Sequence, residues 1–411
     1  MTRMRASTYP MVSIEDALAV VLEHSSVLGT EIVSLGDSFG RVLAETPIAS
    51  DDMPPFLASS VDGYAVIAGD GLLPRRVLAE IIAGNANGGS ITSGAAVRIM
   101  TGAPVPPGAD AVVMVENVTE RDGTMIVDAV PRVGDNLHQR GQDVATGQAI
   151  LMPGVAIGPP EIGLLATVGH TWIRVYRRPI VAVLSTGDEL VEPDQALHPG
   201  AIRDSNRYTL MASVREAGAE ARSLGSVRDD EVEQERRIRE GLEQADVVLT
   251  SGGVSVGSRD LIKPILLGMG TIHFGRVAFK PGKPTTFATV DRKLVFGLPG
   301  FPVSSLVSFE VFVRPALRKL QGYHRIQRTT VQAFVEHNVQ RSPDRPEYQR
   351  FEVRWSGGRL MARSTGIQRS SRLLSLVGAN AFLRVEPGID QIPAGSRVDV
   401  LLVGEIQPGD S

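Results

Sequence analysis

The stretch IVAVLSTGDEL (residues 180–190) decides the fold, because five consecutive apolar residues run directly into a polar turn that contains glycine. Two later stretches repeat this pattern, DVVLTSGGVSVGSRD (246–260) and KLVFGLPGFPVSS (293–305). Short apolar runs without alternation are typical of strands buried on both faces. Amphipathic helices are predicted between and after them, over 206–217, 230–244 and 303–320. This order predicts an open, mostly parallel α/β sheet covered by helices on both sides.

The three loops that follow these strands are the first candidates for a site. Ligands of open α/β sheets bind beyond the carboxyl ends of the strands, where loops 185–190, 251–260 and 297–305 would lie. Glycine lets backbone amides approach an anion, and a helix N-terminus adds positive potential. The alternative is that the glycines only turn the chain into the next helix. Three such loops on one edge favour a phosphate or oxyanion site.

Carboxylates on the same edge predict a metal ion. Mg²⁺ bridges carboxylates to phosphates, so hard oxygen ligands beside such loops suit it. The alternative is that these aspartates cap helices and turns, which fits Asp229 and Asp230 before the predicted helix. The choice between Asp229 and Asp230 stays open. The candidate carboxylates are Asp188, Glu189, Asp204, Asp229, Asp230 and Asp260.

The segment KPGKP (280–284) holds two lysines in a turn stiffened by two prolines. Cations on a rigid segment lose little conformational entropy when they bind an anion. The alternative is a solvated hairpin tip. Arg350 and Ser370 add anion donors if they face the same cleft.

Segments rich in predicted β-strands flank the predicted α/β region on both sides. Short β-prone runs separated by Gly, Pro and Asn occupy 51–148, and a Pro- and Gly-punctuated segment over 149–176 resembles a connecting arm. Beyond residue 326 the chain again predicts strands, with Gly357–Gly358 as a hairpin turn. A helix is predicted over Ser13–His24, with Ser13 as its N-cap.

Composition and motifs exclude several classes of protein. The 411 residues imply several domains, since one domain usually has about 100–200. The net charge of −4 argues against a sequence-independent nucleic-acid binder, and the absence of cysteine excludes thiolate chemistry. No apolar stretch reaches the ~18 residues of a membrane span, and the short apolar run near the N-terminus is unlike a secretory signal, so a cytoplasmic location is expected.

Familiar catalytic motifs are absent or incomplete. A Walker loop, a GxGxxG fingerprint and an HExxH zinc motif are all missing. GVSVG (253–257) matches the nucleophile-elbow pattern around Ser255, but Ser251–Gly253 separates the strand from Ser255, and Gly257 disfavours an immediate helix. A serine hydrolase is therefore a minor alternative.

Nine motifs in fixed order give the chain a specific resemblance. It resembles the molybdopterin molybdenumtransferase family, the group of MoeA and the gephyrin E domain. The motifs are SVDGYAV (60–66), MTGAPVP (100–106), RGQDV (140–144), STGDEL (185–190), IRDSN (202–206), SGGVSVG (251–257), KPGKP (280–284), GLPGFPVS (297–304) and EYQR (347–350).

The resemblance implies an activity and a domain plan. The reaction would insert molybdate into adenylylated molybdopterin with Mg²⁺, release AMP and yield molybdenum cofactor. The resemblance also implies an elongated homodimer and a molybdopterin adenylyltransferase as a partner. The implied domains are a discontinuous arm (1–50 and 146–178), a small β domain (51–145), an α/β domain of the molybdopterin-binding type (179–326) and a C-terminal β domain (327–411).

The resemblance also implies roles for residues of the matching motifs. Asp229 and Asp260 would hold Mg²⁺, with Glu189 nearby. Asp62, Thr101 and Asp143 would complete the cleft from the partner subunit. Contacts with molybdate or phosphate would come from Ser255, Lys280, Lys283, Ser304, Arg350 and Ser370.

One residue departs from the family pattern, and two alternative functions stay open. Phe301 stands where the family usually has Asn, which removes an amide donor beside Ser304. One alternative is a non-catalytic scaffold of the same fold that docks peptides. The other is an insertase specific for tungstate, an anion of nearly the same size and charge as molybdate.

Overall fold

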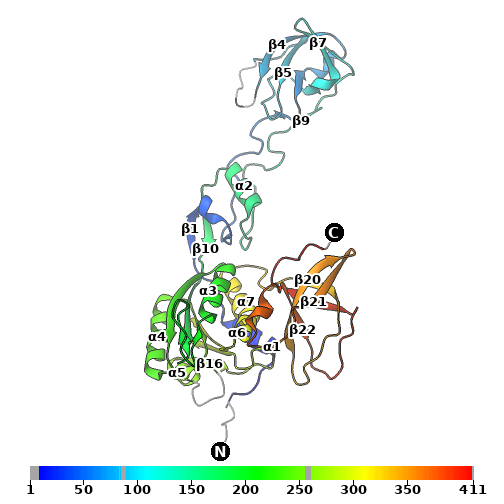
Figure 1. Ribbon diagram of the computed structural model, residues 1–411. Helices are drawn as coiled ribbons and strands as arrows, with labels where there is room; N and C mark the ends of the chain where they lie inside the picture. The colour runs from blue at the N-terminus through cyan, green and yellow to red at the C-terminus, as the bar shows by residue number, and fades with distance from the viewer. Residues whose placement is uncertain (1–8, 83, 85–88, 255–260, 410–411) are drawn as a thin grey trace, which may run out of the picture. The chain divides into compact units, whose positions relative to one another are not determined.

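The computed structural model describes residues 9–82, 84, 89–254 and 261–409 (Figure 1). The chain divides into two compact units, which are described separately. One unit comprises Met1–Glu31, Gly40–Val42 and Tyr176–Ser411, and the other comprises Ile32–Phe39 and Leu43–Val175.

A six-stranded sheet forms the centre of the first unit, in the order β14-β11-β15-β18-β17-β16. Strands β14, β11, β15 and β18 run parallel, whereas β17 pairs antiparallel with both β18 and the edge strand β16. The open, mostly parallel sheet predicted from the sequence is confirmed, although the antiparallel edge was not predicted. The strands are β11 (Ile180–Thr186), β14 (Glu220–Val227), β15 (Val247–Ser251), β16 (Thr271–Phe274), β17 (Thr286–Val290) and β18 (Lys293–Leu298).

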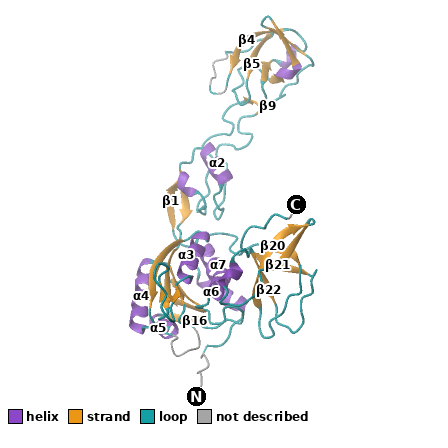
Figure 2. Cartoon of the chain, in the orientation of Figure 1, coloured by secondary structure: helices purple, strands orange, loops and turns teal. Residues whose placement is uncertain are grey.

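Helices cover both faces of this sheet, as Figure 2 shows. Successive residues of a strand point to opposite faces, so Val181 and Val183 enter one core while Ala182 and Leu184 enter the other. The first core also contains α1 (Ile14–His24), α3 (Asn206–Glu216), α6 (Pro302–Ser308) and α7 (Arg314–Leu320). The second contains α4 (Glu231–Gln244) and α5 (Ile262–Met269).

The helical run predicted over 303–320 is interrupted. Between α6 and α7, Phe309–Val313 forms a π-helical segment. Pro315 explains the interruption, because proline donates no backbone hydrogen bond and its ring crowds the preceding turn.

Helix α1 begins as predicted, and it packs in the core beside the six-stranded α/β sheet of the first unit. The Ser13 hydroxyl accepts a hydrogen bond from the Asp16 amide at 3.0 Å, which caps the helix. Its apolar face, with Ile14, Ala17 and Val21, lies in the same core as α7. Part of the 1–50 segment that was predicted to belong to the arm thus packs on the α/β sheet.

The C-terminal strands close into a barrel in the order β19-β21-β20-β22-β23. Gly357 and Gly358 join β20 to β21 with φ of +55° and +74°, the left-handed conformation that a two-residue hairpin turn requires. The predicted hairpin turn is confirmed. The strands are β19 (Thr330–Val335), β20 (Glu347–Ser356), β21 (Arg359–Ser364), β22 (Ala381–Val385) and β23 (Arg397–Leu402).

The second unit contains another six-stranded sheet, in the order β6-β3-β5-β4-β8-β7. Its strands are β3 (Gly63–Val66), β4 (Arg75–Ile81), β5 (Ala95–Ile99), β6 (Ala111–Met114), β7 (Val118–Arg121) and β8 (Thr124–Val127). The remaining elements are β1 (Thr30–Ser34) paired with β10 (Trp172–Tyr176), β2 (Ala58–Ser59) paired with β9 (Leu137–His138), and α2 (Pro159–Thr167). Among the described helices, none is long and apolar enough to span a bilayer.

Candidate functional site

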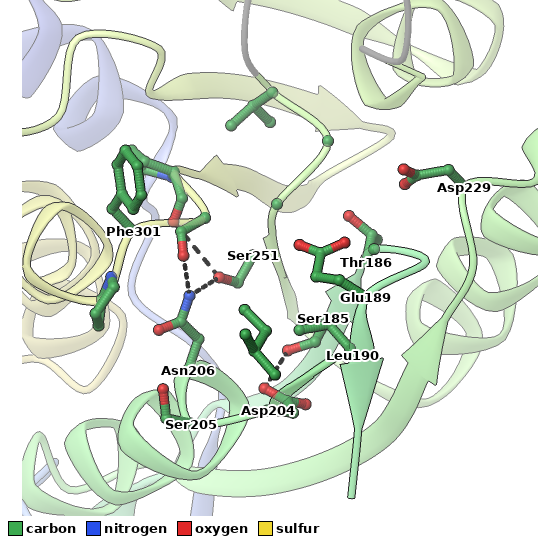
Figure 3. Close-up of a pocket in the computed structure, with 18 of the residues that line it drawn as sticks. Ser185, Thr186, Glu189, Leu190, Asp204, Ser205, Asn206, Asp229, Ser251 and Phe301 are labelled. Atoms are coloured by element: carbon green, nitrogen blue, oxygen red, sulfur yellow. Dashed lines mark hydrogen bonds between the residues drawn. The ribbon is translucent and has the colours of Figure 1, made fainter. Parts of the chain in front are cut away.

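The carboxyl ends of three parallel strands lie level in the α/β unit. Ser185 of β11 pairs with Ser251 of β15, which in turn pairs with Leu298 of β18. The loops that follow therefore start at one edge, as the sequence predicts, and they line a cavity of about 460 Å³ (Figure 3). Short strands β12 (Leu190–Val191) and β13 (Ile202–Arg203) pair and add residues 202–206 to its wall.

Glycine is required where two of these loops approach each other. Gly252 has φ of +100°, and a Cβ there would lie 2.4 Å from the main-chain oxygen of Thr186. No other residue type fits this contact without backbone movement. The hydroxyl of Thr186 is buried and has no hydrogen-bond partner among the described residues. Because a buried hydroxyl without a partner is costly, this cavity wall favours a polar ligand.

Asn206 ties the second and third loops together. It is the first residue of α3, and its side-chain Nδ2 donates to the Ser251 hydroxyl at 2.8 Å and to the Gly300 main-chain oxygen at 2.7 Å (Figure 3). Asn206 belongs to the IRDSN motif, but no role was predicted for it from the sequence. A bond between positions 94 residues apart leaves no local sequence signal.

Asp204 lines the cavity, but its carboxylate is engaged in structural hydrogen bonds. It accepts from the Ser185 hydroxyl at 3.0 Å, from the backbone amide of Arg207 at 3.1 Å and from Arg207 Nε at 2.9 Å. Arg207 also binds both carboxylate oxygens of Glu192, at 2.5 and 2.6 Å. These hydrogen bonds hold the pKa of Glu192 below its usual value. Asp204 therefore positions the loop rather than offering a free metal ligand.

Two other carboxylates line the cavity, Glu189 and Asp229. The neighbouring Asp230 is the N-cap of α4, and its carboxylate accepts from the Glu233 amide at 2.8 Å. Asp188 accepts from the Asp229 backbone amide at 3.1 Å and so steadies that turn. Capping thus accounts for Asp230 and leaves Asp229 as the member of the pair at the cavity.

The donor chemistry at this end of the cavity fits Mg²⁺. Glu189 and Asp229 offer hard oxygens, and magnesium in proteins uses one or two carboxylates together with substrate phosphates and waters. Within the described ranges, no group of three or more acidic or histidine side chains is arranged to hold a metal. Ser255 and Asp260, predicted as anion and metal ligands, lie outside the described residues.

A second group of predicted residues lies where the α/β part of the first unit adjoins the C-terminal barrel. We call these residues the second group: Lys280, Ser304, Arg350 and Ser370. The amide of Tyr348 donates to the Lys280 main-chain oxygen at 2.7 Å, which joins the KPGKP turn to β20. Lys280 Nζ lies 3.0 Å from Glu347 Oε1, so the turn is not a free solvated tip. Ser304 is buried at the start of α6, where the Val303 amide donates to the Ser370 main-chain oxygen at 3.1 Å.

Arg350 is the most buried cation of this second group. Its side chain is 0% exposed, with Nε 3.2 Å from the Ser375 hydroxyl and Nη2 3.3 Å from the Arg369 main-chain oxygen. Nη1 is buried without a hydrogen-bond partner among the described residues. Burial lowers the pKa of Arg350 to about 10, with Glu347 acting in the opposite direction, so the group stays charged at neutral pH. A buried cation with a free donor favours an anion as its missing partner.

The remaining candidates have different environments. Lys283 is half-buried, and its main-chain oxygen accepts a hydrogen bond from the Val277 amide at 2.9 Å. The 460 Å³ cavity is lined by Pro284 but not by the predicted anion ligands Lys280, Lys283, Ser304, Arg350 and Ser370. Phe301, at the N-cap of α6, lines that cavity with 60% of its surface exposed.

Three predicted residues lie in the second unit. Asp62 Oδ1 accepts from the Thr101 amide at 2.7 Å and from the Thr101 hydroxyl at 2.8 Å. These hydrogen bonds hold the pKa of Asp62 below its usual value, so it is ionised at neutral pH. Asp143 has an exposed side chain, and its amide donates to the Met53 main-chain oxygen at 2.9 Å.

Comparison with known proteins finds matches along nearly the whole chain. Residues 12–169 match the MoeA N-terminal region (domain I and II), residues 182–319 a probable molybdopterin binding domain, and residues 333–403 the MoeA C-terminal region (domain IV). The molybdopterin molybdenumtransferase of Haemophilus influenzae is 36% identical over 396 residues, which cover 95% of this chain and 98% of that protein.

Two further relatives extend the comparison. Gephyrin of Dictyostelium discoideum is 35% identical over 98% of this chain, which spans 64% of that longer protein. A crystal structure of a molybdopterin biosynthesis moea protein from Pyrococcus horikosii has a TM-score of 0.82 and 31% identity, with 96% of this chain and 100% of that chain covered. The multidomain fold predicted from the sequence is thereby confirmed.

Proposed function

The chain belongs to the MoeA family of molybdopterin molybdenumtransferases, and from this premise we propose that it inserts molybdate into adenylylated molybdopterin, releasing AMP and forming molybdenum cofactor. The observation that carries the proposal is the cavity at the carboxyl ends of β11, β15 and β18, where three glycine-containing loops meet Glu189 and Asp229. Such a cavity suits a ligand with a phosphate bridge.

In this proposal the carboxylate end of the cavity receives that phosphate bridge. Asp229 would hold Mg²⁺ together with Asp260, which lies outside the described residues, and Glu189 would lie nearby on the same cavity wall. Bound there, Mg²⁺ would neutralise charge that develops on the leaving phosphate. Lys283 would help to neutralise the same charge, because it is a cation that directly precedes Pro284, which lines the cavity. Asn206 and Asp204 keep the loops at fixed positions by the hydrogen bonds described above, so little reorganisation would be needed during the reaction.

We assign molybdate to the second group of residues. Arg350 would donate Nη1 to one molybdate oxygen, with Lys280, Ser304 and Ser370 as further contacts and Ser255 outside the described residues. A dianion there would satisfy a buried guanidinium that otherwise lacks a full set of acceptors. The dithiolene sulfurs that take up the metal belong to the substrate, so the absence of cysteine is no obstacle.

The proposal includes a homodimer and a division into four domains with the ranges given above, except that α1 (Ile14–His24) is counted with the α/β domain, in whose core it packs. Asp62, Thr101 and Asp143 would act from the partner subunit on the bound substrate. The ionised Asp62 carboxylate, held by Thr101, supports a polar role for this motif. A molybdopterin adenylyltransferase is the proposed source of the activated pterin. A cytoplasmic location stays an expectation from the sequence.

The direct test of this function is release of AMP. Purified protein incubated with Mg²⁺, molybdate and adenylylated molybdopterin is expected to release AMP well above a protein-free control, measured by liquid chromatography. A scaffold of the same fold that only docks peptides would release none. Activity with tungstate but not with molybdate would replace the proposal by the tungstate-specific alternative.

The molybdate assignment predicts ligand-dependent stabilisation. Molybdate at about 100 times its dissociation constant should stabilise the wild type by about 2.7 kcal/mol, which thermal unfolding would detect. Arg350→Met should abolish this gain, because the buried cation is gone while the side-chain volume is largely kept. Ser370→Ala, which keeps Arg350, should weaken the gain without abolishing it. Equal stabilisation of wild type and Arg350→Met would contradict the assignment.

A further inference from the structure

Phe301 has an unusual position for an exposed apolar residue. Its side chain is 60% exposed, and it is the single aromatic residue among the described residues that line the 460 Å³ cavity. Scattered exposed apolar residues are common on proteins and need no explanation. An aromatic ring in the wall of a cavity that also carries polar side chains is different, because ligand pockets combine apolar surfaces with a few polar groups.

The backbone that carries Phe301 is held rigidly. Pro302 follows it, and a residue before proline is restricted to extended conformations, as the φ of −73° and ψ of 132° at Phe301 show. Pro299 precedes Gly300, and the main-chain oxygen of Gly300 accepts the hydrogen bond from Asn206 at 2.7 Å. The backbone that carries the Phe301 ring therefore loses little conformational entropy when a ligand binds.

Among the described residues, the Phe301 ring has no aromatic neighbour. No ring contact or cation–π pair involving Phe301 occurs within the part of the chain that the structure describes. Figure 3 places Phe301 on one side of the cavity and Glu189 and Asp229 on the other. A ligand whose phosphate meets the carboxylate side would thus extend toward the aromatic ring.

We propose that Phe301 is a stacking surface for a planar heterocyclic ring of the substrate and so contributes to substrate specificity. The inference rests on the proposed function, whose substrate carries two such rings, the adenine and the pterin. Both have the π-face that an aromatic side chain stacks against. Phe301 lacks hydrogen-bonding groups, so it would select for flat aromatic shape and not for one pattern of donors and acceptors.

Calorimetric titration with partial ligands tests this inference. The ligands are AMP, ribose 5-phosphate and pterin-6-carboxylate, and the proteins are the wild type, Phe301→Ala and Phe301→Tyr. Phe301→Ala should weaken binding of AMP, of the pterin or of both by about 5- to 150-fold, the range found for loss of one stacked base. Binding of ribose 5-phosphate should stay within about twofold, and Phe301→Tyr should bind like the wild type.

The outcome also identifies the ring. Loss confined to AMP assigns the adenine, and loss confined to the pterin assigns the pterin. The inference is overturned if neither ring-bearing ligand binds the wild type, if both bind Phe301→Ala as tightly as the wild type, or if ribose 5-phosphate weakens equally. Because Phe301 is exposed, the variants should unfold at the wild-type temperature. AMP release by the wild type is measured separately, so failure of the proposed function is recognised independently.

Discussion

Replacing Asp229 by Asn is expected to lower the rate of AMP release by about 100-fold or more, the effect typical of losing one group that stabilises developing charge. Asp229 lines the same cavity as Glu189, and an amide of nearly the same size keeps the packing while removing the negative charge. The backbone amide of residue 229 still donates to Asp188, so the turn should persist. Initial rates of AMP release at saturating Mg²⁺ and at a range of Mg²⁺ concentrations would measure both the loss and any weaker metal dependence.

The adjacent residue provides a matched control. Asp230 caps α4, so Asp230→Ala should cost about 1 kcal/mol of stability and lower Tm by roughly 2–4 °C. Its rate of AMP release at a temperature where both proteins are folded should stay close to that of the wild type. The reverse pattern, a slow Asp230→Ala and an active Asp229→Asn, would assign the metal to Asp230 instead.

The sequence predicted the α/β sheet and the meeting of its loops because these depend on local pattern and general topology. Each strand of 180–184, 246–250 and 293–297 is rich in apolar residues, and strands joined through helices must run parallel. Once parallel, their following loops must share one edge, so the cavity wall could be anticipated. Capping of the helix by Asp229 or Asp230 was likewise a local alternative, but the sequence left open which of the two is the cap, and the structure assigns Asp230.

Other features depend on contacts between distant residues and left no such signal. The antiparallel hairpin of β17 and β18 turns at Asp291, which has φ of +54°, and Asp at such a turn is common in loops of many kinds. The hydrogen bonds of Asn206 join residues 45 and 94 positions apart. Arg350 lies on the face of β20 opposite Phe351 and Val353, which enter the barrel core, and it is buried by contacts with residues 369–375 that no local pattern of β20 indicates.

The polar groups of the first unit divide into two kinds, and the division separates support from function. Asp204, Arg207 and Asn206 have their hydrogen bonds satisfied by other residues of the chain. Thr186 and Arg350 each keep one buried polar atom without a partner among the described residues. Satisfied groups fix geometry, whereas unsatisfied ones indicate where a ligand would contribute most.

Breaking the buried ion pair between Arg207 and Asp204 is expected to cause a large loss of stability. Arg207→Leu should lower the free energy of unfolding by about 3–5 kcal/mol, because the Asp204 carboxylate, 1% exposed, is left buried without its partner. Urea unfolding would measure this loss. Arg236→Leu on α4 is the matched control, since that side chain is 59% exposed in a surface ion pair and should cost less than about 1 kcal/mol.

A second substitution reveals whether the buried charge is the cause. Asp204→Asn keeps the size and an acceptor for the Ser185 hydroxyl but removes the charge, so it should destabilise the wild type and stabilise Arg207→Leu. The ion pair between Arg207 and Glu192 adds a pH dependence of stability, because the pKa of Glu192 is lower in the folded protein than its ordinary value of 4.5. The contribution of this ion pair to the free energy of unfolding is therefore present above about pH 4.5 and disappears as the pH falls through the lower pKa of the folded state. Arg207→Leu should lose that part of the acid dependence. If Asp204→Asn destabilises both backgrounds equally, the hydrogen-bond geometry, and not the unpaired charge, explains the loss.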